Sequence, residues 1–297
     1  MLLKTRIPFK YIITKIKFEV LYVFIIGILV SYFTRIFKAE IPIMPIAIPT
    51  FLGTAISVIL SFKLSQSYDR WWEARKVWGT IVNESRSFIL QLQSFVAPGN
   101  ENLIKISAFR QIAWGYSLGQ SLRGQNAIDN LDKYISTTDI ALISKHSNKQ
   151  LAILQLNTLS IAELKNNNQL DLFSQVQINN TVVNFTNAMG MAERIKNTIF
   201  PVTYRYFLHL IIYLFVITLS ISLRDVENYY EVPLLLLISC AFFLLEKTAT
   251  DLQDPFNNQP TDTPVTAIAT TIEINIKQLL NEADVPEALK GNDFYLL

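Results

Sequence analysis

Four stretches without any charged residue divide the chain: residues 20–34, 41–62, 206–223 and 232–245. A helix that crosses a bilayer needs about 20 mostly apolar residues, with a range of about 17–25. The second and third stretches, of 22 and 18 residues, reach that length directly. The first and fourth reach it when extended to residues 18–37, around the single Glu19, and to residues 229–245. The pattern therefore favours four membrane-spanning helices over two spans and two buried core helices.

Short polar loops join the stretches in pairs, and longer polar segments separate and follow the pairs. The segment between them has 15 bases and 10 acids, and the tail from residue 246 has three bases and nine acids. We therefore expect an all-α integral membrane protein, with two helical hairpins flanking a helical cytoplasmic domain. The expected boundaries are 1–62 for the N-terminal segment with the first two spans, 63–205 for the cytoplasmic domain, 206–246 for the last two spans and 247–297 for the acidic tail.

Lysines and arginines near the ends of the spans predict the orientation, because cytoplasmic loops carry an excess of them. Thirteen lie on the side of the termini and the central domain, and three lie in the hairpin loops: Arg35, Lys38 and Arg224. We therefore expect both termini and the central domain in the cytoplasm. No cleavage site with small residues follows the first apolar stretch, which favours an uncleaved span over a signal peptide.

The central segment has the apolar periodicity of helices and no strand-like alternation. The expected helices are residues 63–96, 103–122, 150–164 and 170–196, with one or two short helices in residues 129–144. Another helix is expected to begin at Pro264, since proline suits the first turn, and to run to about residue 280. The acidic tail is either solvated or bound to a basic cytoplasmic domain, its own or that of a neighbouring subunit.

Composition and missing motifs narrow the class of function. The chain has 297 residues, 51% apolar and 17% charged, with a net charge of +2, which argues against disorder and against a basic nucleic-acid-binding protein. The single Cys240 excludes an internal disulfide, and the distant His146 and His209 make a histidine-based metal site a poor interpretation. No phosphate-binding loop, zinc-protease motif or nucleophile elbow is present. We expect no catalytic residues, no cofactor and no nucleic-acid partner.

Two neighbouring stripes run along the second apolar stretch, each with a spacing of four residues. One consists of small residues: Gly53, Ser57, Ser61 and Ser65. The other consists of Thr54, Val58 and Phe62. A stripe of small residues lets another helix approach closely. Either both stripes are helix contacts, or one is a contact between subunits and the other a pore wall. Composition does not choose between these interpretations.

Three segments carry motifs that together extend over most of the chain. Residues 67–79 read SYDRWWEARKVWG, directly after the second apolar stretch. Residues 192–195 (AERI) and 200–204 (FPVTY) precede the third stretch, and Asp254-Pro-Phe256 with Asp262 and Pro264 follows the fourth. In this order the motifs resemble the bestrophin family, in its bacterial branch. The resemblance implies a homopentameric ion channel in the inner membrane, surrounded by lipid, with five second spans around a central pore.

The resemblance also implies a hydrophobic neck in that pore. The ring positions of the neck fall on Thr54, Val58 and Phe62. The positions left for helix packing beside the pore are Gly53, Ser57 and Ser61. Thr54 departs from the aliphatic or aromatic residue usual in the family, and its hydroxyl favours wetting at the outer end of the neck. Counting back without gaps from Glu193 places the family's second constriction at Phe173.

The permeant ion implied by the resemblance is chloride, the family's usual ion. The positive edges of Phe62 rings suit an anion. Some bacterial relatives pass monovalent cations, and a non-conducting membrane scaffold is the alternative outside the channel class. Animal members bind calcium through acids that follow the Asp-Pro-Phe motif, where this chain has NNQPT at residues 257–261. We therefore expect no metal at Asp251, Asp254 and Asp262.

Overall fold

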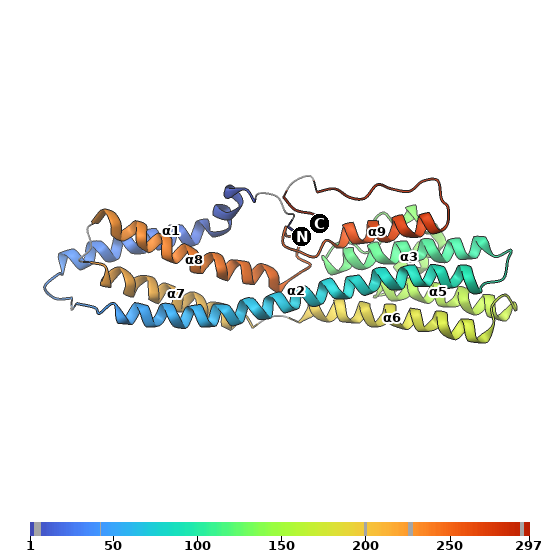
Figure 1. The fold of residues 1–297 in the computed structure, drawn as a ribbon, viewed down its shortest axis with the longest axis horizontal. Helices are drawn as coiled ribbons and strands as arrows, with labels where there is room; N and C mark the ends of the chain where they lie inside the picture. Colours follow the sequence, from blue (N-terminus) through green and yellow to red (C-terminus); the bar gives the residue numbers. More distant parts are fainter. Residues whose placement is uncertain (3–6, 42, 199–200, 225–227, 292–293) are drawn as a thin grey trace. The chain divides into compact units, whose positions relative to one another are not determined.

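The computed structural model describes residues 1–2, 7–41, 43–198, 201–224, 228–291 and 294–297. The helices of this part, shown in Figure 1, are α1 (Phe9–Ile36), α2 (Ala47–Phe95), α3 (Glu101–Leu122), the short 3-10 helix η1 (Leu131–Lys133), α4 (Thr137–Ser144), α5 (Lys149–Asn166), α6 (Leu172–Asn197), α7 (Val202–Ser222), α8 (Asn228–Gln253) and α9 (Val265–Leu279). The β interaction among the described residues is one isolated bridge between Leu2 and Tyr295. The prediction of an all-α chain is confirmed for these residues.

The chain forms two compact units, and α2 contributes to both. The span unit consists of Lys4–Trp71 and Ile199–Gln253. The bundle unit consists of Met1–Leu3, Trp72–Thr198 and Asp254–Leu297. The predicted cytoplasmic helix of residues 63–96 is the direct continuation of the second predicted span, because both belong to the 49-residue helix α2.

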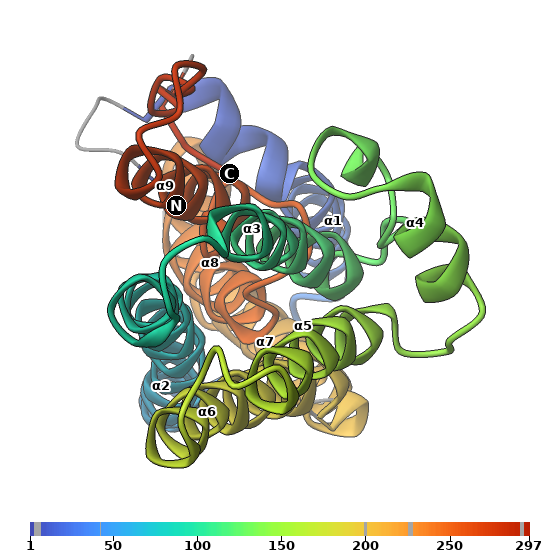
Figure 2. The same ribbon diagram turned by 90° about the vertical axis from the view of Figure 1, so that its right-hand side faces the viewer.

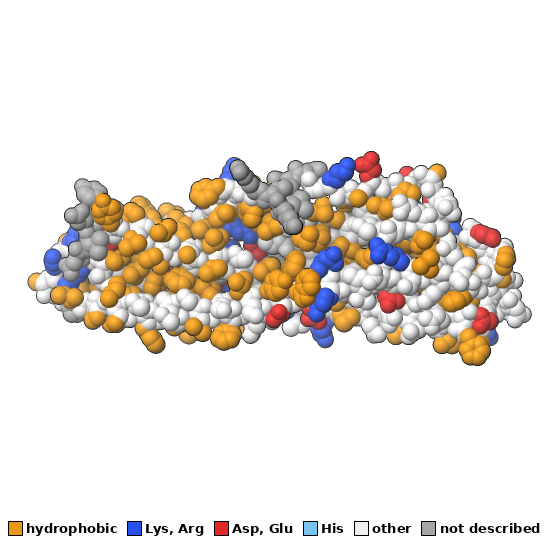
Figure 3. Space-filling model, viewed as in Figure 1, with side chains coloured by type: hydrophobic (Ala, Val, Ile, Leu, Met, Phe, Trp, Pro, Cys, Tyr) orange, Lys and Arg blue, Asp and Glu red, His pale blue; other side chains and the backbone are white. Residues whose placement is uncertain are grey.

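The span unit contains the long apolar helices. Four helices have the length and composition to cross a membrane: Phe9–Ile36, Ala47–Phe95, Val202–Ser222 and Tyr230–Gln253. They are the helices that the four apolar stretches predict. Within the unit α1 packs against α7 and α8, and α7 packs against α8. Figure 3 shows many hydrophobic side chains on the surface over α1, α7 and α8. An apolar surface of this extent suits lipid or another apolar surface rather than water.

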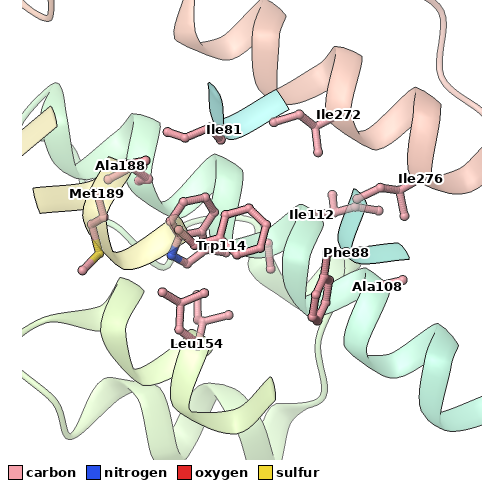
Figure 4. Packing of buried hydrophobic residues seen from close by; sticks show 14 of the residues in the cluster. Ile81, Phe88, Ala108, Ile112, Trp114, Leu154, Ala188, Met189, Ile272 and Ile276 are labelled. Atoms are coloured by element: carbon pink, nitrogen blue, oxygen red, sulfur yellow. The ribbon is translucent and has the colours of Figure 1, made fainter. Parts of the chain in front are cut away.

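In the bundle unit, α3 packs against α5, α6 and α9, and α4 lies at the edge of the unit (Figure 2). The core is built around Trp114 of α3, whose ring centroid lies 5.1 Å from that of Phe185 on α6. Phe88 of α2 meets the same Phe185 edge to face at 5.9 Å. All three side chains are fully buried, and Figure 4 shows Trp114 beside Leu154, Ala188 and Met189. Large aromatic residues thus join α2, α3 and α6 in one core, to which α5 contributes Leu154.

Polar side chains begin several helices of the bundle unit, as capping predicts. Ser136 accepts a hydrogen bond from the Asp139 amide at 3.1 Å, and Asn148 accepts one from the Leu151 amide at 2.9 Å. The helices predicted at residues 103–122, 150–164 and 170–196 are confirmed as α3, α5 and α6, with ends that differ by at most two residues. The prediction of one or two short helices in residues 129–144 is confirmed by η1 and α4.

Candidate pore-lining site

The three residues predicted for a neck lie on one uncovered face of α2, inside the span unit. Val58 is 51% exposed, Phe62 is 65% exposed, and Thr54 is exposed as well. Successive residues of this set are four positions apart, so each is rotated by only about 40° from the one before. Ile56 and Leu60, on the opposite side of the same turns, are buried in the span unit. The helix is thus anchored on one side and presents the predicted neck residues on the other.

A hydrogen bond to the backbone limits how far the Thr54 hydroxyl can favour wetting of the neck. Its hydroxyl donates to the carbonyl oxygen of Thr50, at 2.9 Å, in the preceding turn. The hydroxyl hydrogen is therefore satisfied within α2, and the oxygen is left with acceptor capacity only. At Thr54, water therefore meets a hydroxyl oxygen that can only accept a hydrogen bond, beside an apolar methyl group.

The residues of the small-residue stripe have different surroundings in the structure, because Gly53 contacts another helix whereas Ser57 and Ser61 are exposed. A Cβ atom added to Gly53 would lie 3.2 Å from Cε2 of Phe215, which belongs to α7. Gly53 therefore permits a close helix contact within the span unit. Ser57 and Ser61 are exposed, and the Ser57 hydroxyl donates to the Gly53 carbonyl at 2.8 Å. Their assignment to packing beside a pore stays a prediction.

Phe173, predicted as a second constriction, is the second residue of α6 in the bundle unit. Its side chain is 87% exposed. Asp171 caps this helix by accepting hydrogen bonds from the amides of Phe173 and Ser174, at 2.9 and 3.1 Å. Hydrogen bonds from Ser174 and from the amide of Phe173 hold the pKa of the Asp171 carboxyl below its ordinary value. The cap fixes the backbone of the first turn of α6, from which the exposed Phe173 ring projects.

Asp69 was missed by the sequence reasoning, although it shares the face of the predicted neck. Its side chain is exposed in the span unit, seven residues after Phe62 and 11 after Val58. Both spacings are close to whole numbers of helical turns, so the carboxylate lies within about 20° of each of these residues in rotation about the α2 axis. The spacing of seven and 11 residues is the signal by which Asp69 could have been found in the sequence.

The three acids that follow the fourth apolar stretch have separate partners. Asp251 forms an ion pair with Lys15 in the span unit. Asp254, in the bundle unit, pairs with Lys196 at 2.8 Å and accepts the Phe256 amide at 3.1 Å. Asp262 is fully buried. In the described part of the chain, no three His, Cys, Asp or Glu side chains are grouped so that they could hold a metal ion. The Asp-Pro-Phe motif here joins the end of α6 to the segment after α8.

Replacement of Asp262 by asparagine is expected to stabilise the protein above pH 6. Burial raises the pKa of the Asp262 carboxyl from 3.8 to about 6, against the opposing influence of the Gln259 and Asn257 amides and the Arg123 guanidinium. Because the folded-state pKa is the higher one, the favourable contribution of the protonated acid is complete below about pH 3.8 and is lost as the pH rises through about 6. The difference between the two pKa values corresponds to at most about 3 kcal/mol of folding free energy.

The measurement is the melting temperature of the detergent-solubilised protein across that pH range, for the parent and for Asp262→Asn. The advantage of the variant should be largest above pH 6 and should shrink as the pH falls toward 4, about the ordinary pKa of the carboxyl. An advantage that does not change with pH would contradict the assignment of a raised pKa to this carboxyl.

The comparisons with known proteins agree with this architecture. The family model of bacterial and fungal bestrophin proteins matches residues 4–278. The voltage-dependent anion channel-forming protein YneE of Escherichia coli (strain K12) is 31% identical over 247 residues, which cover 83% of this chain and 80% of that protein. A relative of the same description from Mesorhizobium japonicum, mll4386, is 25% identical over 88% of this chain and 83% of its own length.

Solved structures show the same fold. The crystal structure of a bacterial bestrophin homologue from Klebsiella pneumoniae superimposes with a TM-score of 0.85 at 25% identity and covers 91% of this chain and all of that one. Four apolar helices and channel-named relatives define this chain as a helical membrane protein. More narrowly, the chain belongs to the bestrophin family, in its bacterial and fungal branch. The family predicted from the three motifs is confirmed.

Proposed function

We propose that this chain forms a homopentameric channel that passes chloride and other small anions through a neck of five Thr54, Val58 and Phe62 side chains. The observation that carries the proposal is the uncovered face of α2, where these three residues stand opposite the buried Ile56 and Leu60. The names of the relatives, which describe voltage-dependent anion channel-forming proteins, support the class of ion. A channel is accordingly favoured over an enzyme.

A single uncovered helix face encloses no passage, but a closed ring of identical faces does. Cyclic symmetry brings the same face of every subunit to one axis. Val58 and Phe62 then form apolar rings in which an ion sheds part of its hydration, and the neck closes by dewetting and by side-chain motion. Gly53, Ser57 and Ser61 lie beside these rings and serve contacts between helices, and Phe173 forms a second constriction in the cytoplasmic bundle unit. The proposed location is the inner membrane, with both termini in the cytoplasm.

Asp69 favours a second candidate, a monovalent cation channel of the same architecture. Its exposed carboxylate lies on the same face of α2 as Phe62. In a pentamer, five such carboxylates would form a negatively charged ring next to the neck. Rings of acidic side chains favour cations in channels. The balance between the apolar neck and the Asp69 ring therefore decides the ion selectivity.

The reversal potential in a planar bilayer under a KCl gradient tests both candidates, because its sign depends on which ion carries the current. Anion selectivity is expected for the parent. Asp69→Asn should move the reversal potential further toward the chloride equilibrium potential. A unit charge near water contributes about 1 kcal/mol at 4 Å, which corresponds to about a fivefold change in the permeability ratio.

The matched control is Asp132→Asn, which removes an exposed acid in the bundle unit, on η1. A reversal potential that shifts equally in both variants would contradict the assignment of Asp69 to the pore. A parent potential on the cation side would replace the anion channel by the second candidate. The mass of the purified protein in detergent tests the pentamer, and a pentamer that passes no current would favour a membrane scaffold.

A further inference from the structure

Lys63 follows Phe62 directly on α2, and its charged side chain is completely buried in the span unit. Its Nζ lies 2.7 Å from Oε1 of Glu246 and 2.9 Å from Oγ1 of Thr250, both on α8. The side chains of Lys63 and Glu246 are 0% and 3% exposed. Burying a charged side chain is costly unless it is paired and hydrogen-bonded, and a buried ion pair often adds little to stability. This pair therefore calls for an explanation beyond packing.

Glu246 connects α8 to two other helices through its two oxygens. Oε1 accepts hydrogen bonds from Lys63 on α2 and from Thr250, which donates at 2.9 Å. Oε2 lies 3.2 Å from Nε2 of His209 on α7. On the α2 side, the Lys63 carbonyl accepts the hydroxyl of the buried Ser67 at 2.7 Å. One carboxylate thus links α2, α7 and α8 at the turn that follows Phe62.

Two other ion pairs in the same region link α1 to α8. Asp251 of α8 pairs with Lys15 of α1, and Lys247 of α8 lies 3.9 Å from Glu19 of α1. Of these three ion pairs, Lys63–Glu246 is the one that includes α2. The neighbouring pairs provide a natural comparison, because they share α8 but not the helix of the proposed neck.

We propose that Lys63, held by Glu246, is a positioning residue that fixes the rotation of α2 and holds Phe62 in the pore. Consecutive residues of a helix point about 100° apart, so Lys63 faces the interior of the span unit while Phe62 faces outward. A rotation that withdrew the five Phe62 rings would have to break the pair and separate two buried, opposite charges. The pair therefore stabilises the narrow, closed neck. This inference rests on the proposed channel function.

The test uses the double variant Lys63→Met/Glu246→Leu in the full-length channel. Lys63→Met alone leaves the buried Glu246 carboxylate without its lysine and is prone to misfold, whereas apolar replacement of both partners of a buried pair is commonly tolerated. In planar bilayers the double variant is expected to raise the open probability about fivefold or more, in the range of allosteric coupling effects. The single-channel conductance and the reversal potential should equal those of the parent, because Phe62, Val58 and Asp69 are retained.

Lys247→Met is the matched control, since it removes the neighbouring ion pair of α8 without touching α2, and its open probability should equal that of the parent. An open probability that is unchanged or reduced in the double variant would overturn the positioning role. An increase of the same size in Lys247→Met would also overturn it. A parent that passes no current would reject the channel itself, an outcome separate from a conducting parent whose gating the double variant does not change.

Discussion

Replacement of Phe62 by alanine is expected to raise the mean current of the channel about tenfold or more. The largest side chain of the proposed neck is 65% exposed, and a ring of five such side chains narrows and dries the pore. Alanine removes the aromatic rings and leaves space that water can fill. A barrier lowered by about 1.4 kcal/mol is enough for a tenfold increase. Currents at a fixed voltage, divided by the number of reconstituted channels, give the measurement.

Substitutions at the other two neck positions are expected to change the current by graded amounts. Val58→Ala should act in the same direction with a smaller effect, because less apolar volume is removed. Thr54→Ile should reduce the current, since it replaces a residual acceptor by an alkyl group at the outer ring. Phe207→Ala is the control, because Phe207 is 54% exposed on α7, outside the proposed pore wall. If all three neck variants leave conductance and gating at the parent level, the neck assignment is wrong.

The neck and the Lys63–Glu246 pair also make a joint prediction. If the pair acts by holding Phe62 in the pore, its removal should have little further effect once Phe62 is alanine. The effects of Phe62→Ala and of Lys63→Met/Glu246→Leu on open probability should therefore be strongly non-additive, as expected of residues that act through one another. Independent, additive effects would separate the pair from the neck.

Most of the fold can be predicted from hydrophobic periodicity, because its main helices are long and have a strong apolar pattern. The predicted start of α3 differs from the observed one by two residues and the predicted end is identical, because Pro98-Gly99 before the helix and Arg123-Gly124 after it are local signals. The four membrane-spanning helices can likewise be predicted from the sequence, because each overlaps a stretch that has no charged residue. The same is true of the Thr54, Val58 and Phe62 stripe, because a spacing of four residues places side chains on one helix face wherever the helix lies.

Contacts between distant segments could not be read in this way. Lys63 ends an apolar stretch, and on sequence alone it is one more base at the membrane boundary. Its partner Glu246 is 183 positions away, and only the packing of α2 against α8 brings the two together. The prediction for Gly53 shows the same limit, because the identity of its neighbour, Phe215 on α7, depends on the tertiary fold. A residue pattern gives the face of a helix but not what covers it.

Replacement of Trp114 by alanine is expected to cost the bundle unit about 3–5 kcal/mol of folding free energy, as large-to-small changes in a core commonly do. The indole is fully buried, and it packs against Phe185 at 5.1 Å between centroids. Because α3 lies against α5, α6 and α9, a cavity at Trp114 reaches several helices at once (Figure 4). The apparent melting temperature of the detergent-solubilised protein should fall on the order of 10 °C.

Leu142→Ala is the control for this change, since Leu142 is 44% exposed on the peripheral α4 and should shift the melting temperature little. Equal shifts in the two variants would contradict a core centred on Trp114. Trp114 lies in the bundle unit, whereas the proposed neck lies in the span unit. Trp114→Ala should therefore lower the yield of assembled channel. The surviving channels should keep the single-channel conductance of the parent, because the neck is unchanged and the Asp171 cap still holds the first turn of α6, which carries Phe173. A changed conductance would show that the bundle core also sets the geometry of the conducting path.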